Sequence, residues 1–214
     1  MSSLKLYYHP LASYCWKVLI ALYESDVPFE RELVDLSAPE QRAALARLSP
    51  FAKFPAVADR GRAIWESTTI IEYLARHHAG RAQLVPADPE VAFEVRRLDR
   101  FFDLYVHESM QRIVLDKLRP DGKRDPLGVE HARATLATAY EWLERELGAR
   151  SWAAGEAFSL ADCAAAPALY YANRVAPFGP NHPRIGAYLG RLHARPSFAR
   201  TFEEAQPYLP NFPG

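Results

Sequence analysis

The fold is decided by one stretch of the chain, which reads SPFAKFPAV over residues 49–57 and WESTTIIEYL over residues 65–74. Pro55 stands just before a predicted strand, where it cannot donate a hydrogen bond to a sheet. We therefore expect a tight turn, for which a cis peptide bond is one solution. Glu66 and Ser67 open a predicted helix with an apolar face that includes Ile70 and Leu74. A turn with unpaired backbone groups beside such a helix start can hold a zwitterionic peptide.

The composition is that of a folded chain without a dominant charge. Hydrophobic residues make up 49% of the 214 residues and charged residues 24%, which is enough for a packed core. Lys plus Arg and Asp plus Glu both number 26, so no basic field attracts nucleic acid. Cys15 and Cys163 lie too far apart for a CxxC motif, which argues against a metal site and a disulfide framework. No signal peptide or membrane-spanning run is recognisable, so we expect a cytoplasmic protein without membrane contact.

Strand and helix signals alternate over the first 78 residues. Strands are expected at 4–8, at 29–34 and, as a hairpin, at 56–58 and 63–65. Helices are expected at 16–23, at 39–48 (opened by Ser37) and at 67–77. This order predicts a small mixed sheet with helices packed on it. The segment 79–89 contains Gly80, Pro86 and Pro89 and is the best linker candidate.

Beyond this linker the apolar residues recur with helical spacing, and no strand is predicted. One apolar stripe runs from Val91 to Tyr105, and another covers 136–147 with Gly148 placed to end its helix. Further helices are expected at 160–174 and 183–195. The second half of the chain is therefore predicted to be all-helical.

The tetrad SLAD at residues 159–162 has the form of a capping box. The Ser159 hydroxyl can accept a hydrogen bond from the amide of Asp162, and the Asp162 carboxylate can accept one from the amide of Ser159. Aspartate stands where glutamate is more usual, so its reach is shorter. We interpret the tetrad as a folding signal rather than a catalytic group.

Together these motifs resemble the cytosolic glutathione S-transferase family, in particular its bacterial serine-, beta- and zeta-type members. Four motifs follow one another in the family's order along essentially the whole chain: YYHP at residues 7–10, Phe54-Pro55, Glu66-Ser67 and the SLAD tetrad. The resemblance implies a thioredoxin-like α/β domain over residues 1–79, and an all-helical domain over 89–214 that contributes the electrophile site. It also implies glutathione as co-substrate, no metal, and a homodimer in which the first domain of one subunit meets the second domain of the other.

The resemblance assigns glutathione-binding roles residue by residue. Pro55 matches the family's cis-proline, and Phe54 matches the residue whose backbone pairs with the cysteinyl part of glutathione. Glu66 matches the acid that takes the γ-glutamyl amine, and Ser67 matches the hydroxyl that takes the carboxylate together with helix amides. Lys53 stands near a polar contact to the tripeptide. Taken singly, Ser67 is also an ordinary helix cap and Glu66 a favourable charge at a helix start.

The donor that stabilises the glutathione thiolate has several candidates. Aligned from Lys17, the family's serine or cysteine falls on Ala12, which has no donor. Aligned from the tyrosine pair at 7–8, it falls on Ser13, our first choice because Ser13 is the only hydroxyl just inside the helix start. Tyr8 is the second candidate, and backbone amides are the third. Ser13 as a plain N-cap and Tyr8 as a core residue are the alternatives without catalytic meaning.

The resemblance places the electrophile mainly on the helical domain. His107 resembles a histidine that beta-type members place near the substrate. Tyr105 and Met110 would add an apolar wall, and Leu11 and Ala12 would contribute from the first domain. The physiological electrophile is not readable from the residues.

These features predict a glutathione S-transferase that adds the thiolate to a small hydrophobic electrophile. The first alternative is a non-catalytic glutathione-binding or scaffold protein, which the missing donor at Ala12 favours. The second is a glutathione-dependent isomerase, dehalogenase or peroxidase, because function depends on the site and not on the fold. Thiol–disulfide exchange is not expected, since Ala12 stands where a glutaredoxin-type motif has its first cysteine and Cys15 stands in place of the second.

Overall fold

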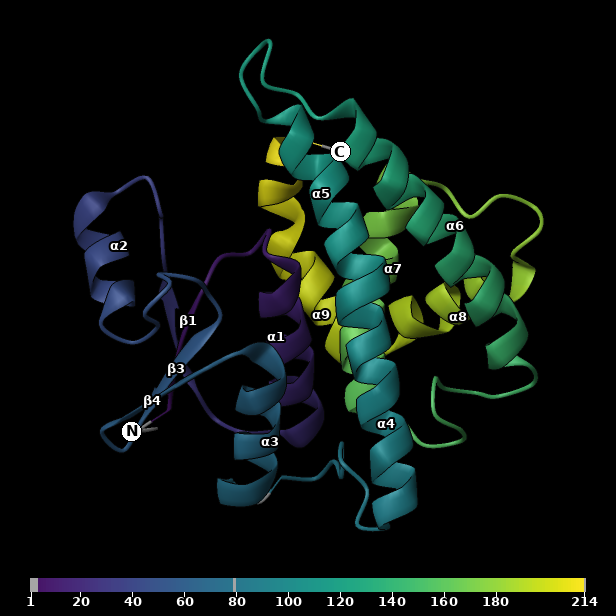
Figure 1. Cartoon of the computed structure of the whole chain (residues 1–214). Helices are drawn as coiled ribbons and strands as arrows, with labels where there is room; N and C mark the ends of the chain where they lie inside the picture. Colours follow the sequence, from purple (N-terminus) through teal and green to yellow (C-terminus); the bar gives the residue numbers. More distant parts are fainter. Residues whose placement is uncertain (1–3, 79, 214) are drawn as a thin grey trace. The chain divides into compact units, whose positions relative to one another are not determined.

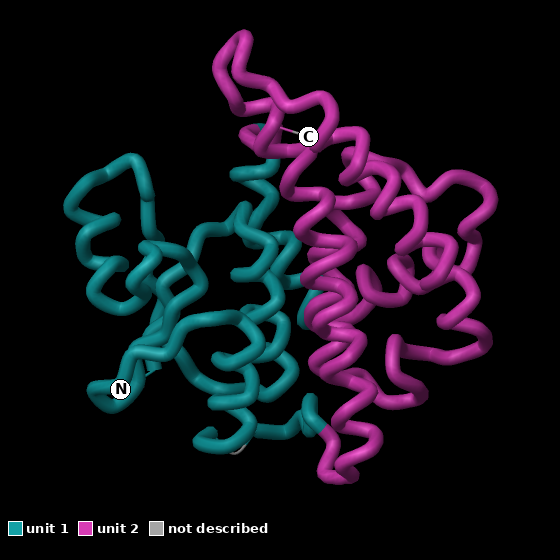
Figure 2. The backbone as a smooth tube through the Cα atoms, viewed as in Figure 1, with its two compact units in different colours: residues 1–85, 197–210 teal, residues 86–196, 211–214 magenta. Residues whose placement is uncertain are grey.

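The computed structural model describes residues 4–78 and 80–213. The chain forms two compact units, Met1–Val85 with Ser197–Pro210, and Pro86–Pro196 with Asn211–Gly214 (Figure 2). These units differ from the expected domains, 1–79 and 89–214, chiefly in residues 197–210, which belong to the first unit. The expected domain borders themselves stay a prediction.

The first unit follows the predicted order of strands and helices (Figure 1). Its elements are β1 (Lys5–Tyr8), α1 (Ser13–Ser25), β2 (Glu30–Leu33), α2 (Pro39–Ala46), β3 (Ala56–Asp59), β4 (Arg62–Trp65), α3 (Ser67–His77), nearly all of α9 (Pro196–Ala205) and most of the 3-10 helix η2 (Gln206–Asn211). Helix α1 begins earlier than the predicted 16–23, because the carbonyl of Ala12 accepts hydrogen bonds from the amides of Cys15 (2.8 Å) and Trp16 (3.1 Å).

The four strands form one mixed sheet in the order β2-β1-β3-β4. Strand β1 is parallel to β2 and antiparallel to β3, and β3 is antiparallel to β4. The register places Glu32, Tyr7, Ala56 and Trp65 in one row across the sheet. Because β1 and β4 end next to this row while β3 begins in it, the connections at this end of the sheet lie close together.

The two faces of the sheet are covered by different helices, as the alternation of side chains along a strand requires. Tyr7 and Ala56 face α2, where they pack with Val34 and Leu45. The next residue pair in the register, Leu6 and Val57, lies on the opposite face and is fully buried. Helices α1 and α3 pack against each other on that second face (Figure 1).

Helix α9 packs on α1, although it follows the helical unit in sequence. The indole of Trp16 meets the rings of Phe198 and Phe202 at centroid distances of 5.8 and 6.3 Å. Glu204 accepts hydrogen bonds from Tyr23 (2.8 Å) and from Arg31 on β2 (2.9 Å). These contacts explain why residues 197–210 join the first unit.

The regular elements of the second unit, among its described residues, are all helices, apart from one isolated bridge between Trp152 and Gly155. Its elements are α4 (Pro89–Phe101), η1 (Phe102–His107), α5 (Glu108–Lys117), α6 (Pro126–Leu147), α7 (Leu160–Val175) and α8 (Pro183–Ala194). Helix α7 packs against α4, η1, α5 and α8. The capping box at its start is present as predicted, and Gly148 ends α6 with a φ of 50°. The mixed sheet and this helical unit confirm the predicted fold class.

One local prediction was wrong. Ser37 does not open α2, because its hydroxyl donates to Asp35 (2.7 Å) and the N-cap position is occupied by Ala38. The segment from Val91 to Tyr105 is helical as predicted, but these two side chains are 45% and 53% exposed. Tyr105 lies in η1, a π-helix, whose wider turn changes the spacing of side chains after α4.

None of the helices within residues 4–78 and 80–213 combines the length and apolar character needed to cross a membrane.

Candidate functional site

The predicted site residues of the first unit follow strand ends that the register brings to one end of the sheet. Tyr8 ends β1, Pro55 immediately precedes β3, and Glu66 immediately follows β4. In the row that contains Tyr7, Ala56 and Trp65, Ala56 begins β3, Trp65 ends β4, and Tyr7 lies one residue before the end of β1. Three connections, at residues 9–12, 52–55 and 66–67, therefore converge there.

The proline turn before β3 has the geometry expected from the sequence. The Phe54–Pro55 peptide bond is cis. Pro55 is buried, Phe54 is half-buried and Lys53 is exposed. Ala52 has a φ of 48°, a left-handed conformation that residues with a Cβ atom adopt rarely.

The start of α3 contains a second unusual backbone conformation. Glu66 has a φ of 71° and a ψ of 120°, outside the regions that non-glycine residues favour. Such a conformation costs about 1–3 kcal/mol and persists where the surrounding structure fixes it, often at binding sites. Ser67 is the first helical residue and is buried, while the Glu66 side chain is exposed. An acid, a hydroxyl and the positive end of a helix dipole are thus grouped at one point, which suits a ligand with both an amine and a carboxylate.

The start of α1 places Ser13 as the first helical residue. Its side chain is 8% exposed, and the N-cap before it is Ala12, which offers no side-chain hydrogen bond. Ser13 is therefore not the N-cap, although it lies inside the first turn, where the backbone dipole favours a negative charge. Leu11 and Ala12 are half-buried in the same connection.

Side-chain contacts join the three connections. The imidazole of His9 stacks on Phe54 with a centroid distance of 6.0 Å and an interplanar angle of 18°. Phe51 meets Trp65 edge-on at 6.0 Å. The ammonium of Lys17, one turn after Ser13, donates to the hydroxyl of Thr68 on α3 at 2.9 Å.

Tyr8 lies in a different environment from Ser13. Its phenol is half-buried, and burial raises its pKa above the ordinary value, which the Arg31 guanidinium only partly offsets. Because Arg31 also binds Glu204 at 2.9 Å, Tyr8 belongs to the charged cluster that holds α9 to the sheet. A phenol with a raised pKa is a weaker hydrogen-bond donor toward a thiolate than an ordinary tyrosine.

Cys15 and Cys163 are both free and fully buried. Burial raises the pKa of Cys15 to about 12, so its thiol stays protonated at neutral pH. Because the thiolate is the reactive form, Cys15 lacks the ionisation that a redox nucleophile needs.

The residues expected at the electrophile site of the second unit lie in two different environments. His107 ends η1 and is 3% exposed, and Met110 in α5 is 4% exposed. Tyr105 is 53% exposed and lies instead beside an open groove between α4, η1 and α6. The structure therefore does not gather these three side chains into one exposed wall.

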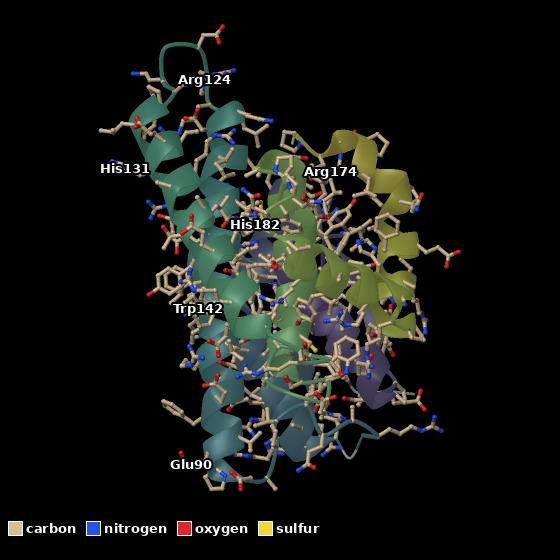
Figure 3. The ribbon with its side chains drawn as sticks, turned by 90° about the vertical axis from the view of Figure 1, so that its right-hand side faces the viewer. Glu90, Arg124, His131, Trp142, Arg174 and His182 are labelled. Carbon is tan, nitrogen blue, oxygen red and sulfur yellow. The ribbon has the colours of Figure 1, made fainter. Side chains whose placement is uncertain are left out.

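That groove has a volume of about 940 Å³ and was not anticipated from the sequence. Its lining includes Phe93, Phe101, Tyr105 and Trp142 and three arginines at 96, 97 and 100. The guanidinium of Arg97 lies over the indole of Trp142 at 5.2 Å, and Trp142 projects outward from α6 (Figure 3). Aromatic residues and arginine are enriched in protein interfaces, and an exposed apolar surface of this kind indicates an interaction.

Sequence reasoning also missed His9, which was quoted only as part of the YYHP motif. The ring lies between the proline turn and the start of α1, so it contacts two of the three connections. A histidine directly after a buried strand and before a proline was the available signal. Its partner, Phe54, is more than forty residues away in sequence and becomes its neighbour only through the β1–β3 pairing.

Comparisons with known proteins agree with this arrangement. Residues 12–77 match the family model of the glutathione S-transferase N-terminal domain, and residues 126–199 match that of the C-terminal domain. The chain is 32% identical over 213 residues to glutathione S-transferase 3 of Zea mays, covering 94% of both chains. It is 29% identical over 204 residues to a probable maleylacetoacetate isomerase of Caenorhabditis elegans, again covering 94% of both.

Among solved structures, a glutathione S-transferase from Methylobacillus flagellatus with glutathione bound superposes with a TM-score of 0.86. The identity is 28%, and the match covers 93% of this chain and 98% of the other. Two domain models in the right order, relatives that match over nearly their full length and a shared fold all agree: this chain is a member of the glutathione S-transferase family.

Proposed function

We propose that this chain binds glutathione at the three converging connections of the first unit and activates its thiol. The backbone of Phe54, held by the cis bond to Pro55, pairs with the cysteinyl part. Glu66 takes the γ-glutamyl amine, and Ser67 with the first amides of α3 takes the carboxylate. Lys53, which is exposed beside the turn, adds a polar contact. The convergence of these residues at one end of the sheet is the observation that carries the proposal.

Ser13 is proposed to stabilise the thiolate. A free thiol has a pKa of about 8.5, and lowering it by two units requires about 2.7 kcal/mol in favour of the anion. A hydroxyl that donates to a charged sulfur supplies about 1.5–3 kcal/mol. The positive end of α1 adds about 0.3–1 kcal/mol. One well-placed donor at the start of α1 is therefore sufficient, with Tyr8 and the backbone amides as the alternatives.

The reaction is the transfer of the glutathione sulfur to a hydrophobic electrophile in the cytoplasm. With a chloro-nitrobenzene, the thiolate forms the carbon–sulfur bond, the carbon–chlorine bond breaks, and chloride leaves with the electron pair. The thiol proton goes to solvent. Leu11 and Ala12 beside Ser13 are proposed to contact the electrophile, and Tyr105, His107 and Met110 stay the candidates from the helical unit.

A second candidate is a glutathione-dependent isomerase. It is supported by the Caenorhabditis elegans relative, whose name is that of a probable maleylacetoacetate isomerase. In that reaction glutathione adds to the substrate and leaves again, so it acts as a cofactor. The same thiolate site serves both reactions, and the two differ in whether a thioether accumulates. A non-catalytic binding protein remains the reading that Ala12 favours.

We also propose that two copies form a homodimer. Phe51, in the loop before the proline turn, is 68% exposed, and the groove between α4 and α6 is apolar and open. Insertion of Phe51 of one copy into the groove of the other would cover both. Such a contact occurs twice in a two-fold dimer.

The test is retention on immobilised glutathione followed by turnover of a chloro-nitrobenzene and of maleylacetoacetate, the substrate named in the Caenorhabditis elegans relative. Thioether formation from the first supports the transferase. Isomerisation of the second without consumption of glutathione supports the isomerase. Retention without either reaction supports the binding protein, and an absence of saturable glutathione binding by calorimetry contradicts all three.

A further inference from the structure

His9 occupies a fixed position between the two connections that would surround the glutathione sulfur. Its carbonyl accepts a hydrogen bond from the amide of Ala12 at 3.0 Å, and its Nδ1 accepts one from the amide of Leu11 at 3.2 Å. Its ring stacks on Phe54 on one side, and the ring of Tyr208 from η2 meets it edge-on at 5.9 Å. All of these residues belong to the first unit.

The hydrogen bond from Leu11 defines the protonation state of the imidazole. A backbone N–H can only donate, so Nδ1 must hold a lone pair, and the single ring proton of His9 is on Nε2. In the protonated imidazolium both nitrogens are donors. Two donors would then face each other at the turn that leads into α1, and the hydrogen bond would be lost.

Building on the proposed function, we propose that His9 is a positioning residue whose neutral imidazole holds the start of α1 and the proline turn in register around the glutathione sulfur. It acts through its neighbours: the Leu11 amide fixes the turn before Ser13, and the stacked Phe54 ring fixes the backbone that pairs with the cysteinyl part. Misplacement of reacting groups by about 1 Å can cost about a hundredfold in rate.

The groups around His9 determine the pH at which this arrangement fails. The titratable groups that face it are the Asp35 carboxylate after β2, the Tyr208 phenol in η2 and the Cys15 thiol, which contacts the His9 backbone. Burial lowers the pKa of His9 below its ordinary value, and Asp35 opposes this effect. The folded state therefore binds the proton less well than the unfolded state does. The turn is stable above pH about 6.5 and loses stability as the pH falls below it.

Two substitutions separate the roles of the ring. In His9→Asn the amide oxygen can replace Nδ1 as the acceptor for Leu11 and does not titrate. In His9→Phe the stacking on Phe54 is kept, but the acceptor is lost. Each variant is measured for kcat and for KM of glutathione with a chloro-nitrobenzene across pH 5–8. The pKa of the bound thiol is measured by thiolate absorbance.

At pH 8, where His9 of the unmodified protein is neutral, we expect His9→Phe to lower kcat by about tenfold and to raise the pKa of the bound thiol, with a smaller change in KM. The difference from the unmodified protein should narrow as the pH falls and His9 itself becomes protonated. We expect log kcat of the unmodified protein to fall more steeply than one unit per pH unit over the range in which His9 titrates, because both His9 and the thiol become protonated there. In His9→Asn the slope should not exceed one, and kcat at pH 8 should be lowered only by the loss of the stacking on Phe54.

The control is His193→Asn, which removes another half-buried imidazole whose burial lowers its pKa, in α8 of the second unit. This variant should keep the steep fall of the unmodified protein. A His9→Phe variant with unchanged kcat and thiol pKa, or a His9→Asn variant that keeps the steep limb, overturns the proposal while leaving the transferase assignment intact. Failure of the proposed function itself gives a different result: the unmodified protein then neither binds glutathione nor converts the chloro-nitrobenzene.

Discussion

At the start of α1 a side-chain hydroxyl and the positive end of a helix act on the same point. Ser13 is buried there, in the first turn after an N-cap that contributes no side-chain hydrogen bond. The positive helix end acts on any anion at this point, whereas the hydroxyl depends on one side chain. Their contributions can therefore be separated by substitution.

We expect Ser13→Ala to raise the pKa of bound glutathione by about one to two units, the equivalent of one lost hydrogen bond to a charged sulfur. Affinity for glutathione should change little, because the amine, carboxylate and backbone contacts remain. The thiolate absorbance of the complex, titrated against pH, measures this. An unchanged titration would shift the role to Tyr8 or to the backbone amides, and Tyr8→Phe is the matching control.

In Glu66 the backbone conformation affects the stability of the fold, whereas the side-chain carboxylate is proposed to affect glutathione binding. Its φ of 71° is unfavourable for any residue with a Cβ atom, so alanine keeps the same backbone cost. Glu66→Ala should therefore leave the free energy of unfolding within about 0.5 kcal/mol of its original value. Loss of the carboxylate should weaken glutathione binding by about ten- to a hundredfold.

Calorimetry with glutathione and denaturant unfolding measure the two effects of Glu66→Ala independently. Full affinity in a folded variant would remove Glu66 from the site. Weak binding in a destabilised variant would mean that the carboxylate supports the fold and not the ligand.

At the scale of elements, Asp162 both caps helix α7 and forms part of the buried core. The carboxylate is fully buried and accepts hydrogen bonds from the amide and hydroxyl of Ser159 (2.8 and 3.0 Å), from the amide of Ala153 (2.8 Å) and from Tyr188 (2.5 Å). Burial raises the pKa of Asp162, against the effect of these donors. The residue thus ties α7 to α8 and to the loop before α7.

The sequence alone gives about 1 kcal/mol for this capping residue. The structure predicts a larger loss for Asp162→Ala, about 3–5 kcal/mol, because three further donors would be left buried without an acceptor. Thermal and denaturant unfolding measure it, with Asp88→Ala at the exposed N-cap of α4 as the control, for which about 1 kcal/mol is expected. Equal losses in the two variants would contradict the network.

Local signals predicted the strands and most of the helices, but they missed α9 (Pro196–Ala205) and placed the start of α1 too late. The proline turn, the helix start at Ser67 and the capping box are encoded within a few neighbouring residues, and each was recognisable. The π-helix at Phe102–His107 depends on packing against α7 and α6, so the periodicity could not show that Tyr105 leaves the apolar stripe. The mistaken role of Ser37 has a local origin, since Asp35, two residues earlier, accepts the hydrogen bond from its hydroxyl.

At the scale of the whole molecule, chain order and packing order differ. Residues 197–210 follow the helical unit but are held to the first unit by Trp16, Tyr23 and Arg31. An apolar stripe of a helix indicates that the helix is packed, but it does not say on what. The helices predicted at 160–174 and 183–195 are present as α7 and α8, whereas α9 (Pro196–Ala205), which packs on α1, was not among the predicted helices.

Contacts within one chain do not explain why Phe51 and the apolar groove beside Trp142 are exposed. If the proposed homodimer forms, Phe51→Ser removes one buried aromatic side chain from each of two equivalent contacts. Burial of such a side chain stabilises by about 1.5–3 kcal/mol, so the dimer should lose about 3–6 kcal/mol. Its dissociation constant should rise by at least about a hundredfold.

Sedimentation velocity over a range of protein concentrations measures this change. Leu127→Ser is the control, because Leu127 is 60% exposed and is not among the residues that line the groove. It should leave the association unchanged, and Trp142→Ala should weaken it as Phe51→Ser does. Equal dissociation constants for Phe51→Ser and the unmodified protein would exclude Phe51 from the interface. A protein that stays monomeric at every concentration would contradict the proposed homodimer and would leave the groove to another occupant.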